Sequence, residues 1–211
     1  MNSSAGGPRV LGCGEDTLTL WALTKQTGAF LNALHDDSSV SETTVFLRPS
    51  FGRGRRVRSA GAVAEFGELD GIVRTRQAIY LVEAKCARSG ELVDDPVVLR
   101  DVQTRRHEVL RAYLESWRET APHDWKSFGG SIQTVFGSAS WGLKVAPLGS
   151  LLAGNLEFVL RDLADTHLPI VDVLLVLVPA GWTRKLSAPP RFRLVQLEYT
   201  PVEGSEFVDL T

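Results

Sequence analysis

The sequence predicts an α/β fold in which a central mixed β-sheet is flanked by helices. Three observations lead to this prediction. Two strand-like arms flank a short polar break at 74–77, segments 15–35 and 97–117 carry apolar residues at helical spacings, and segment 171–178 is almost wholly apolar, as in a strand covered on both faces. Strands and helices that alternate along a chain in this way are typical of α/β domains.

Composition and length are those of a globular protein. The chain has 211 residues, of which 44% are hydrophobic and 23% charged, and a chain of this length buries about 70% of its unfolded surface. Its formal net charge of −2 provides no global field that attracts nucleic acid. Cys13 and Cys86 are its two cysteines, which is too few for a disulfide scaffold or a zinc site.

The N-terminal segment and the hydropathy pattern indicate in which cellular compartment the protein is expected. Residues 1–12 lack the charged and apolar pattern of a signal peptide, and we expect them to form a flexible tail. No run of the sequence approaches the roughly 18 apolar residues of a membrane span. We therefore expect a cytoplasmic protein without a membrane partner.

The first helix is expected at 15–35, and its acidic first turn, from Glu15, suits the positive end of the helix dipole. A β-rich run at 43–47 follows and ends before Pro49. The next segment is a basic loop punctuated by glycines. Its arginines either contact phosphates without reading bases or are simply solvated; they are Arg53, Arg55, Arg56 and Arg58.

The central stretch is 67–85, which reads as two strands joined by a short loop. With a loop of two or four residues, the numbers of facing residues sum to 153, and Asp70 lies across from Glu83 at a Cβ separation of ~5 Å. Strand alternation places Lys85 on the face of Glu83 and Leu69 on the face opposite to Asp70. Facing carboxylates repel unless a proton or a cation compensates them, and Mg²⁺ prefers such hard oxygen ligands. The sequence predicts a metal site here, with a plain hairpin carrying solvated charges as the alternative.

These residues resemble a known nuclease signature. Asp70, a spacer of twelve residues and then Glu83-Ala84-Lys85 are similar to the PD-(D/E)XK motif of the restriction-endonuclease-like superfamily. The preceding Gly67-Glu68-Leu69-Asp70 resembles the Gly-Glu-Ile-Asp form of its Holliday-junction-resolvase-like branch, although Leu69 stands where the literal motif has proline. The resemblance implies a restriction-endonuclease-like core and a Mg²⁺ ion, replaceable by Mn²⁺.

The resemblance also assigns roles to individual residues. It implies that Asp70, Glu83 and the carbonyl of Ala84 hold the metal and that Lys85 acts in catalysis. Glu15 on the first helix is a further candidate metal ligand, beside its explanation as a helix-start acid. The helix after the motif supplies Gln103 as a candidate catalytic residue, and the neighbouring Glu68 is a candidate accessory carboxylate.

The remaining elements complete the expected architecture. A helix at 97–117 is followed by a strand at 132–136, a helix at 151–163 and strands at 171–178 and 193–200. We expect 13–140 to form the nuclease-like core and 141–211 to form a C-terminal α/β extension packed on the same domain. His107, on the first of these helices, is expected to be a surface residue.

The leading functional prediction is a metal-dependent endo- or exonuclease that hydrolyses phosphodiester bonds of nucleic acid, preferably DNA. A small domain of this kind commonly works in a restriction, repair or phage-defence assembly, so a protein partner or a homo-oligomer is expected. The alternative is a catalytically inactive nuclease-like module that serves binding or assembly. A weaker third hypothesis, an HD-type phosphohydrolase, comes from the His-Asp pairs at 35–36 and 123–124.

Overall fold

The computed structural model describes residues 9–50, 68–87, 90–138, 146–164 and 167–210. Five strands form one mixed sheet in the order β2-β3-β4-β5-β6. They are β2 (Thr44–Leu47), β3 (Gly71–Arg74), β4 (Ile79–Cys86), β5 (Ile170–Pro179) and β6 (Phe192–Tyr199). The first three are antiparallel neighbours, and β5 and β6 run parallel to β4. This mixed sheet flanked by helices confirms the α/β prediction at that level.

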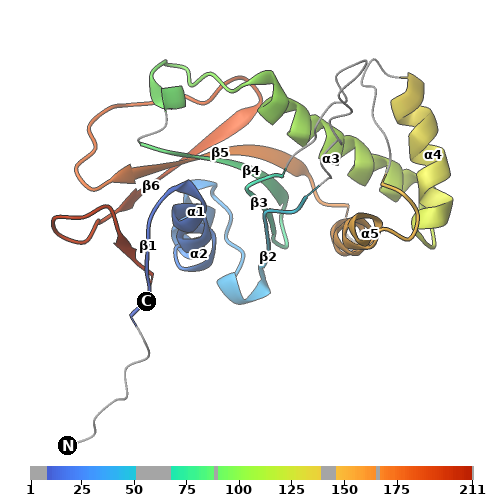
Figure 1. Cartoon of the computed structure of the whole chain (residues 1–211), viewed down its shortest axis with the longest axis horizontal. Helices are drawn as coiled ribbons and strands as arrows, with labels where there is room; N and C mark the ends of the chain where they lie inside the picture. The colour runs from blue at the N-terminus through green and yellow to red at the C-terminus, as the bar shows by residue number, and fades with distance from the viewer. Residues whose placement is uncertain (1–8, 51–67, 88–89, 139–145, 165–166, 211) are drawn as a thin grey trace, which may run out of the picture.

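Helices cover both faces of the sheet (Figure 1). One face packs against α1 (Glu15–Thr24) and α2 (Thr27–Ala33), and the other against α3 (Asp101–Thr120), α4 (Trp125–Ser138) and α5 (Leu151–Ala164). Side chains of β4 alternate between these two cores. Tyr80, Val82 and Ala84 face α1 and α2, whereas Ile79 and Leu81 face α3, α4 and α5. Two short 3₁₀ helices lie at Val40–Glu42 and Gly90–Leu92.

The sheet includes the segment expected to be an extension. β5 lies between β4 and β6, and its apolar side chains enter the cores on both faces, as a continuous apolar strand predicts. Residues 141–211 therefore supply two of the five strands, rather than packing onto a sheet completed before residue 140. The expected division between a core and an extension does not correspond to a boundary in the sheet.

One predicted helix and one predicted strand differ from the structure. The single helix expected at 15–35 is broken at Lys25-Gln26 into α1 and α2. The strand expected at 132–136 lies inside α4, where Phe128 and Ile132, four residues apart, are both fully buried in the core with α3 and α5. A short apolar run has the same appearance in a strand and in a buried helix turn.

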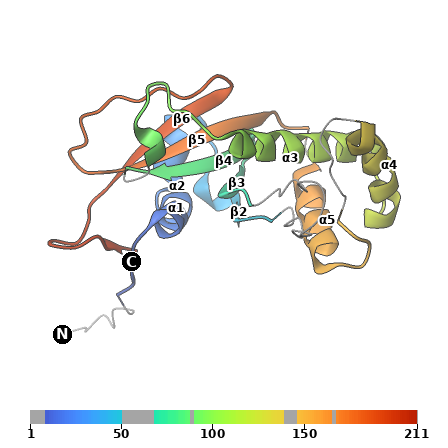
Figure 2. The ribbon, with the colours of Figure 1, turned by 45° about the horizontal axis from the view of Figure 1, so that its top comes forward.

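The first and last described strands lie side by side at one edge of the molecule (Figure 2). β1 (Leu11–Gly12) pairs antiparallel with β7 (Val208–Asp209), and Arg9 Nε lies 2.8 Å from Asp209 Oδ2. Leu11 and Gly12, the last residues of the expected tail at 1–12, are held by backbone pairing with a strand about two hundred residues away. None of the described helices is both long and apolar enough to cross a membrane.

The hairpin of β3 and β4 has the predicted register. Gly71 faces Val82 and Arg74 faces Ile79, so facing residue numbers sum to 153, and the four residues 75–78 join the two strands, with Thr75 N donating to Ala78 O at 3.0 Å. Gly71 also has a packing role. A Cβ at this position would lie 2.5 Å from Leu23 Cδ1 of α1, so glycine lets the helix approach the first residue of β3 closely.

The loop end of this hairpin is held by a buried carboxylate, and its removal should destabilise the fold. Asp36 Oδ2 accepts hydrogen bonds from Thr75 Oγ1 at 2.7 Å and Tyr80 Oη at 2.8 Å. Asp36→Ala leaves both hydroxyls without this acceptor, which should cost about 2 kcal/mol of unfolding free energy. Urea unfolding measures this, with Asp37→Ala, an exposed neighbour, as the matched control. An unchanged midpoint in Asp36→Ala would contradict the assigned role.

Candidate active site

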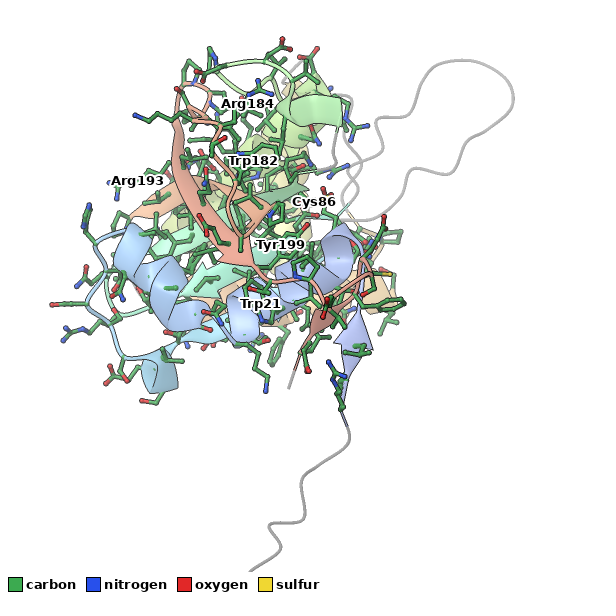
Figure 3. All side chains as sticks on the ribbon, turned by 90° about the vertical axis from the view of Figure 1, so that its left-hand side faces the viewer. Trp21, Cys86, Trp182, Arg184, Arg193 and Tyr199 are labelled. Carbon is green, nitrogen blue, oxygen red and sulfur yellow. The ribbon has the colours of Figure 1, made fainter. Side chains whose placement is uncertain are left out.

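The candidate site lies at the end of β4, where this strand extends past its neighbour. β3 begins at Gly71, opposite Val82, so among the described residues the backbone groups of β4 beyond that pair have no partner strand on the β3 side. Two carboxylates accept hydrogen bonds from the N–H groups on this edge instead. Ala84 N donates to Asp70 Oδ2 at 2.7 Å, and Cys86 N donates to Glu15 Oε2 at 3.2 Å. In the view of Figure 3, Cys86 lies between Trp182 and Tyr199.

This arrangement explains why segments far apart in sequence meet here. N–H groups that point to one side of a strand recur at every second residue, so Ala84 and Cys86 present two donors along the same edge. A buried backbone donor requires an acceptor. The first turn of α1 and the residue before β3 provide one carboxylate each, so Glu15 and Asp70 are brought to the strand that carries Glu83.

Glu83 and Lys85 form a buried ion pair on the α3 side of β4. Lys85 Nζ donates to Glu83 Oε1 at 2.9 Å and to Ala84 O at 2.8 Å, and lies 3.9 Å from Glu15 Oε1. The side chain of Glu83 is 1% exposed. Its other oxygen, Oε2, is buried without a hydrogen-bond partner in the described structure.

The electrostatics of the site favour protonation of one acid. Burial, followed by the negative charge of Glu83, raises the pKa of Asp70 from 3.8 to about 7, although the Ala84 N–H and Lys85 oppose this shift. Burial alone would lower the pKa of Lys85, but the charge and hydrogen bond of Glu83 outweigh it, and the pKa of Lys85 is raised. The positive charge of Lys85 therefore does not fully balance the negative charges of the acids.

Stability without metal should therefore depend on pH. In the folded protein the raised pKa lets Asp70 keep its proton up to about pH 7, whereas in the unfolded chain the proton leaves near pH 3.8. The folded state binds more protons in this window, so this group makes stability fall as pH rises through it. Asp70→Asn does not titrate and should lack this part of the slope. Urea unfolding in EDTA at several pH values measures it, and equal slopes in both proteins would contradict the assignment.

The residues fit part of a magnesium site. Among the described residues, no group of three or more His, Cys, Asp or Glu side chains is placed to hold a metal ion. Mg²⁺ commonly uses one or two protein carboxylates and completes its shell with waters and phosphate oxygens. Asp70 and Glu83 Oε2, which accepts no hydrogen bond in the described structure, match this need. The Ala84 carbonyl oxygen, in contrast, already accepts the Lys85 ammonium.

The segment before β3 departs from the predicted alternation. Regular strand structure begins at Gly71 rather than at residue 67, and Leu69 packs in the same core as Ile72, on the α3 side of the sheet. Glu68, the candidate accessory acid, accepts from Arg48 Nε at 3.0 Å and Nη2 at 2.7 Å. The alternation is interrupted because the chain bends at Asp70. The bend lets the Asp70 carboxylate accept the hydrogen bond from Ala84 N.

Gln103 and the arginines of the basic loop were also predicted to belong to the site. Gln103 is buried, and its Oε1 accepts from Arg100 N at 2.7 Å in a capping box at the start of α3; its catalytic role stays a prediction. The arginines of the basic loop lie outside the described residues: Arg53, Arg55, Arg56 and Arg58.

The expectation that His107 is a surface residue is wrong. It is fully buried, and its Nδ1 lies 2.9 Å from Asp172 Oδ1 of β5. Arg111 Nη2 and Arg191 Nε each lie 2.9 Å from Asp172 Oδ2. Burial raises the pKa of Asp172, but the hydrogen bond and charge of His107 and the two arginine charges outweigh this, and its pKa is lowered. The charged residue in an otherwise apolar strand was the signal, because a buried charge needs partners.

The His-Asp pairs behind the phosphohydrolase hypothesis have structural roles. Asp36 is the buried acceptor at the hairpin loop, and Asp124 accepts from Ser127 N at 2.8 Å in the first turn of α4. The described residues contain no metal-ligand cluster that includes them. We therefore do not retain this hypothesis.

A small pocket connects the acidic site to the surface. Its volume is about 180 Å³, and it is lined by Asp70 together with residues of α1 and β2: Asp16, Thr19, Leu20, Leu47 and Arg48.

In comparisons with protein-family models, curated proteins and solved structures, none matches this chain. The chemistry of these side chains is therefore the basis for a functional assignment.

Proposed function

We propose that this protein is a metal-dependent nuclease that hydrolyses phosphodiester bonds of nucleic acid, preferably DNA. One observation carries the proposal: Asp70 and Glu83 are neighbours at the end of β4, where Glu83 Oε2 is buried without a hydrogen-bond partner among the described residues and where burial, followed by the charge of Glu83, raises the pKa of Asp70. Two acids in this state gain from a shared divalent cation. The resemblance of Asp70 and Glu83-Ala84-Lys85 to the PD-(D/E)XK motif gives the same chemistry.

Each side chain has a defined part in this proposal. Asp70 and Glu83 would hold Mg²⁺ or Mn²⁺, with Glu15 at the rim of the site. When bound, such a cation polarises a phosphoryl oxygen and lowers the pKa of an attacking water. Lys85 Nζ fixes Glu83 through Oε1, and its charge is close enough to the acids to stabilise negative charge that develops on a phosphate.

Cleavage by the purified protein is the direct test. It is incubated with supercoiled, linear and single-stranded DNA and with RNA, in Mg²⁺, in Mn²⁺ or in EDTA. We expect products in the presence of either metal and none in EDTA. Failure to cut any of these substrates, by protein whose folding is confirmed, would contradict the nuclease assignment.

A catalytically inactive binding module is a second candidate, and one observation favours it. Lys85 already neutralises Glu83 Oε1 and occupies the Ala84 carbonyl, so the pair is partly compensated without a metal. Calorimetry separates the two candidates. The nuclease requires Mg²⁺ or Mn²⁺ binding that depends on Asp70, whereas the inactive module predicts nucleic-acid binding without metal binding.

A further inference from the structure

An arginine of α3 reaches the acidic pair from outside the motif. Arg106 Nη1 lies 4.0 Å from Glu83 Oε2, the oxygen that accepts no hydrogen bond among the described residues. The same nitrogen donates to Glu68 O at 3.0 Å, so the side chain is anchored to the segment that leads into Asp70. Its side chain is 20% exposed, so it is not fully enclosed by the described residues.

The guanidinium has donors that the described part of the protein does not use. It carries five N–H groups, yet among the described residues its hydrogen-bond acceptor is Glu68 O, and its buried Nε has none. Arg48, which contacts the Glu68 side chain, differs. Its Nε and Nη2 donate to Glu68 Oε2, and its Nη1 donates to Asp16.

We propose that Arg106 binds a non-bridging oxygen of the substrate phosphodiester beside Glu83. The planar fork of arginine matches phosphate oxygens and forms charge-assisted hydrogen bonds with them. Its position next to Glu83 Oε2 also separates this carboxylate from an incoming anion and reduces their repulsion. The identity of the substrate rests on the proposed nuclease function, whereas anion binding by Arg106 is measurable apart from cleavage.

Three variants isolate this contact. Arg106→Gln removes the charge, Arg106→Lys keeps the charge without the fork, and Arg76→Gln is the matched control. Arg76 is an exposed arginine paired with Asp37 at the loop end of the hairpin, whereas the acids lie at the other end of β4. Thermal melting first establishes that all three variants fold.

The first measurement is binding to a labelled oligodeoxynucleotide in EDTA over a range of salt concentrations. Arg106→Gln should bind about tenfold more weakly, as expected for the loss of a hydrogen bond to a charged group. Its salt dependence should flatten by ~0.7–0.9 log units, the value for one lost phosphate contact. Arg106→Lys should recover the salt slope but only part of the affinity. An Arg106→Gln variant with wild-type affinity and slope would overturn the proposal.

Two further measurements separate this proposal from the nuclease assignment. Inorganic phosphate, with and without Mg²⁺, should raise the melting temperature of wild type and Arg76→Gln but not of Arg106→Gln. Single-turnover cleavage should fall by about 10²-fold in Arg106→Gln, because a fixed cation stabilises developing charge. If phosphate protects only the proteins that keep Arg106 and no protein cuts, the Arg106 site stands and the nuclease assignment fails. If wild type binds neither phosphate nor nucleic acid, the Arg106 site is refuted.

Discussion

Asp70→Asn should abolish metal-dependent cleavage and leave the protein folded. The asparagine side chain has the same shape, and its carbonyl oxygen can still accept the hydrogen bond that Ala84 N donates at 2.7 Å. What it removes is the negative charge that a divalent cation needs. Loss of one member of a catalytic unit commonly lowers turnover by ~10⁴-fold or more, so cleavage of plasmid DNA should fall below detection.

Two measurements make the Asp70→Asn result specific. Calorimetry should show that Mg²⁺ and Mn²⁺ no longer bind. Melting in EDTA above pH 7 should show stability at least equal to wild type, because the repulsion from Glu83 is gone. Glu83→Gln is a less clean variant, since it removes the carboxylate that lies 2.9 Å from the buried Lys85 ammonium.

Glu198→Gln is the matched control for the loss of one negative charge. This glutamate is exposed on β6, a strand at the edge of the sheet. Its substitution replaces a carboxylate by an amide, as Asp70→Asn does, and should leave cleavage and metal binding as in wild type. Cleavage by Asp70→Asn at the wild-type rate would refute the assignment of the metal site.

The central hairpin was the part of the fold that local sequence rules could predict. Its short loop of even length fixes the register, and the register determines which side chains face each other. Gly71 therefore faces Val82, and Asp70 lies next to the strand that carries Glu83. The apolar strand β5 was equally predictable, because a strand buried on both faces has no polar side to alternate with.

The failures come from information that is not local. Residues 132–136 have the composition of a short strand, whereas they lie inside α4, whose Phe128 and Ile132 pack in the core with α3 and α5. The partners of Asp172 come from α3 and from the residue before β6, so His107 appears as a surface histidine until the sheet and helix are brought together. Arg106 was missed for the same reason: its neighbour Glu83 is twenty-three positions earlier in the chain.

Lys85→Met should separate metal binding from catalysis. The ammonium of Lys85 lies 2.9 Å from Glu83 Oε1, but it carries a positive charge and therefore cannot be a metal ligand itself. Its removal should leave Mg²⁺ binding in place, since Asp70 and Glu83 remain. Loss of one charge-stabilising donor commonly lowers the rate by ~10²–10³-fold, which is the expected fall in single-turnover cleavage.

Methionine is chosen because the stem of Lys85 is almost fully buried, with 4% of the side chain exposed. It keeps most of the apolar volume, although Glu83 loses its ion-pair partner, so melting in the presence of Mg²⁺ must first confirm a folded protein. Lys25→Met, at an exposed position after α1, is the matched control. Calorimetry and cleavage are then measured on the same preparation.

The possible results for Lys85→Met lead to different conclusions. Retained metal binding with slow cleavage supports a charge-stabilising role for Lys85 and, with it, the nuclease assignment. Full cleavage activity would refute that role, because the only ammonium within 4 Å of Glu83 in the described structure would then be dispensable. A wild-type protein that neither binds metal nor cuts would instead favour the inactive module. In that module the contact of Lys85 with Glu83 is a structural ion pair at the end of β4.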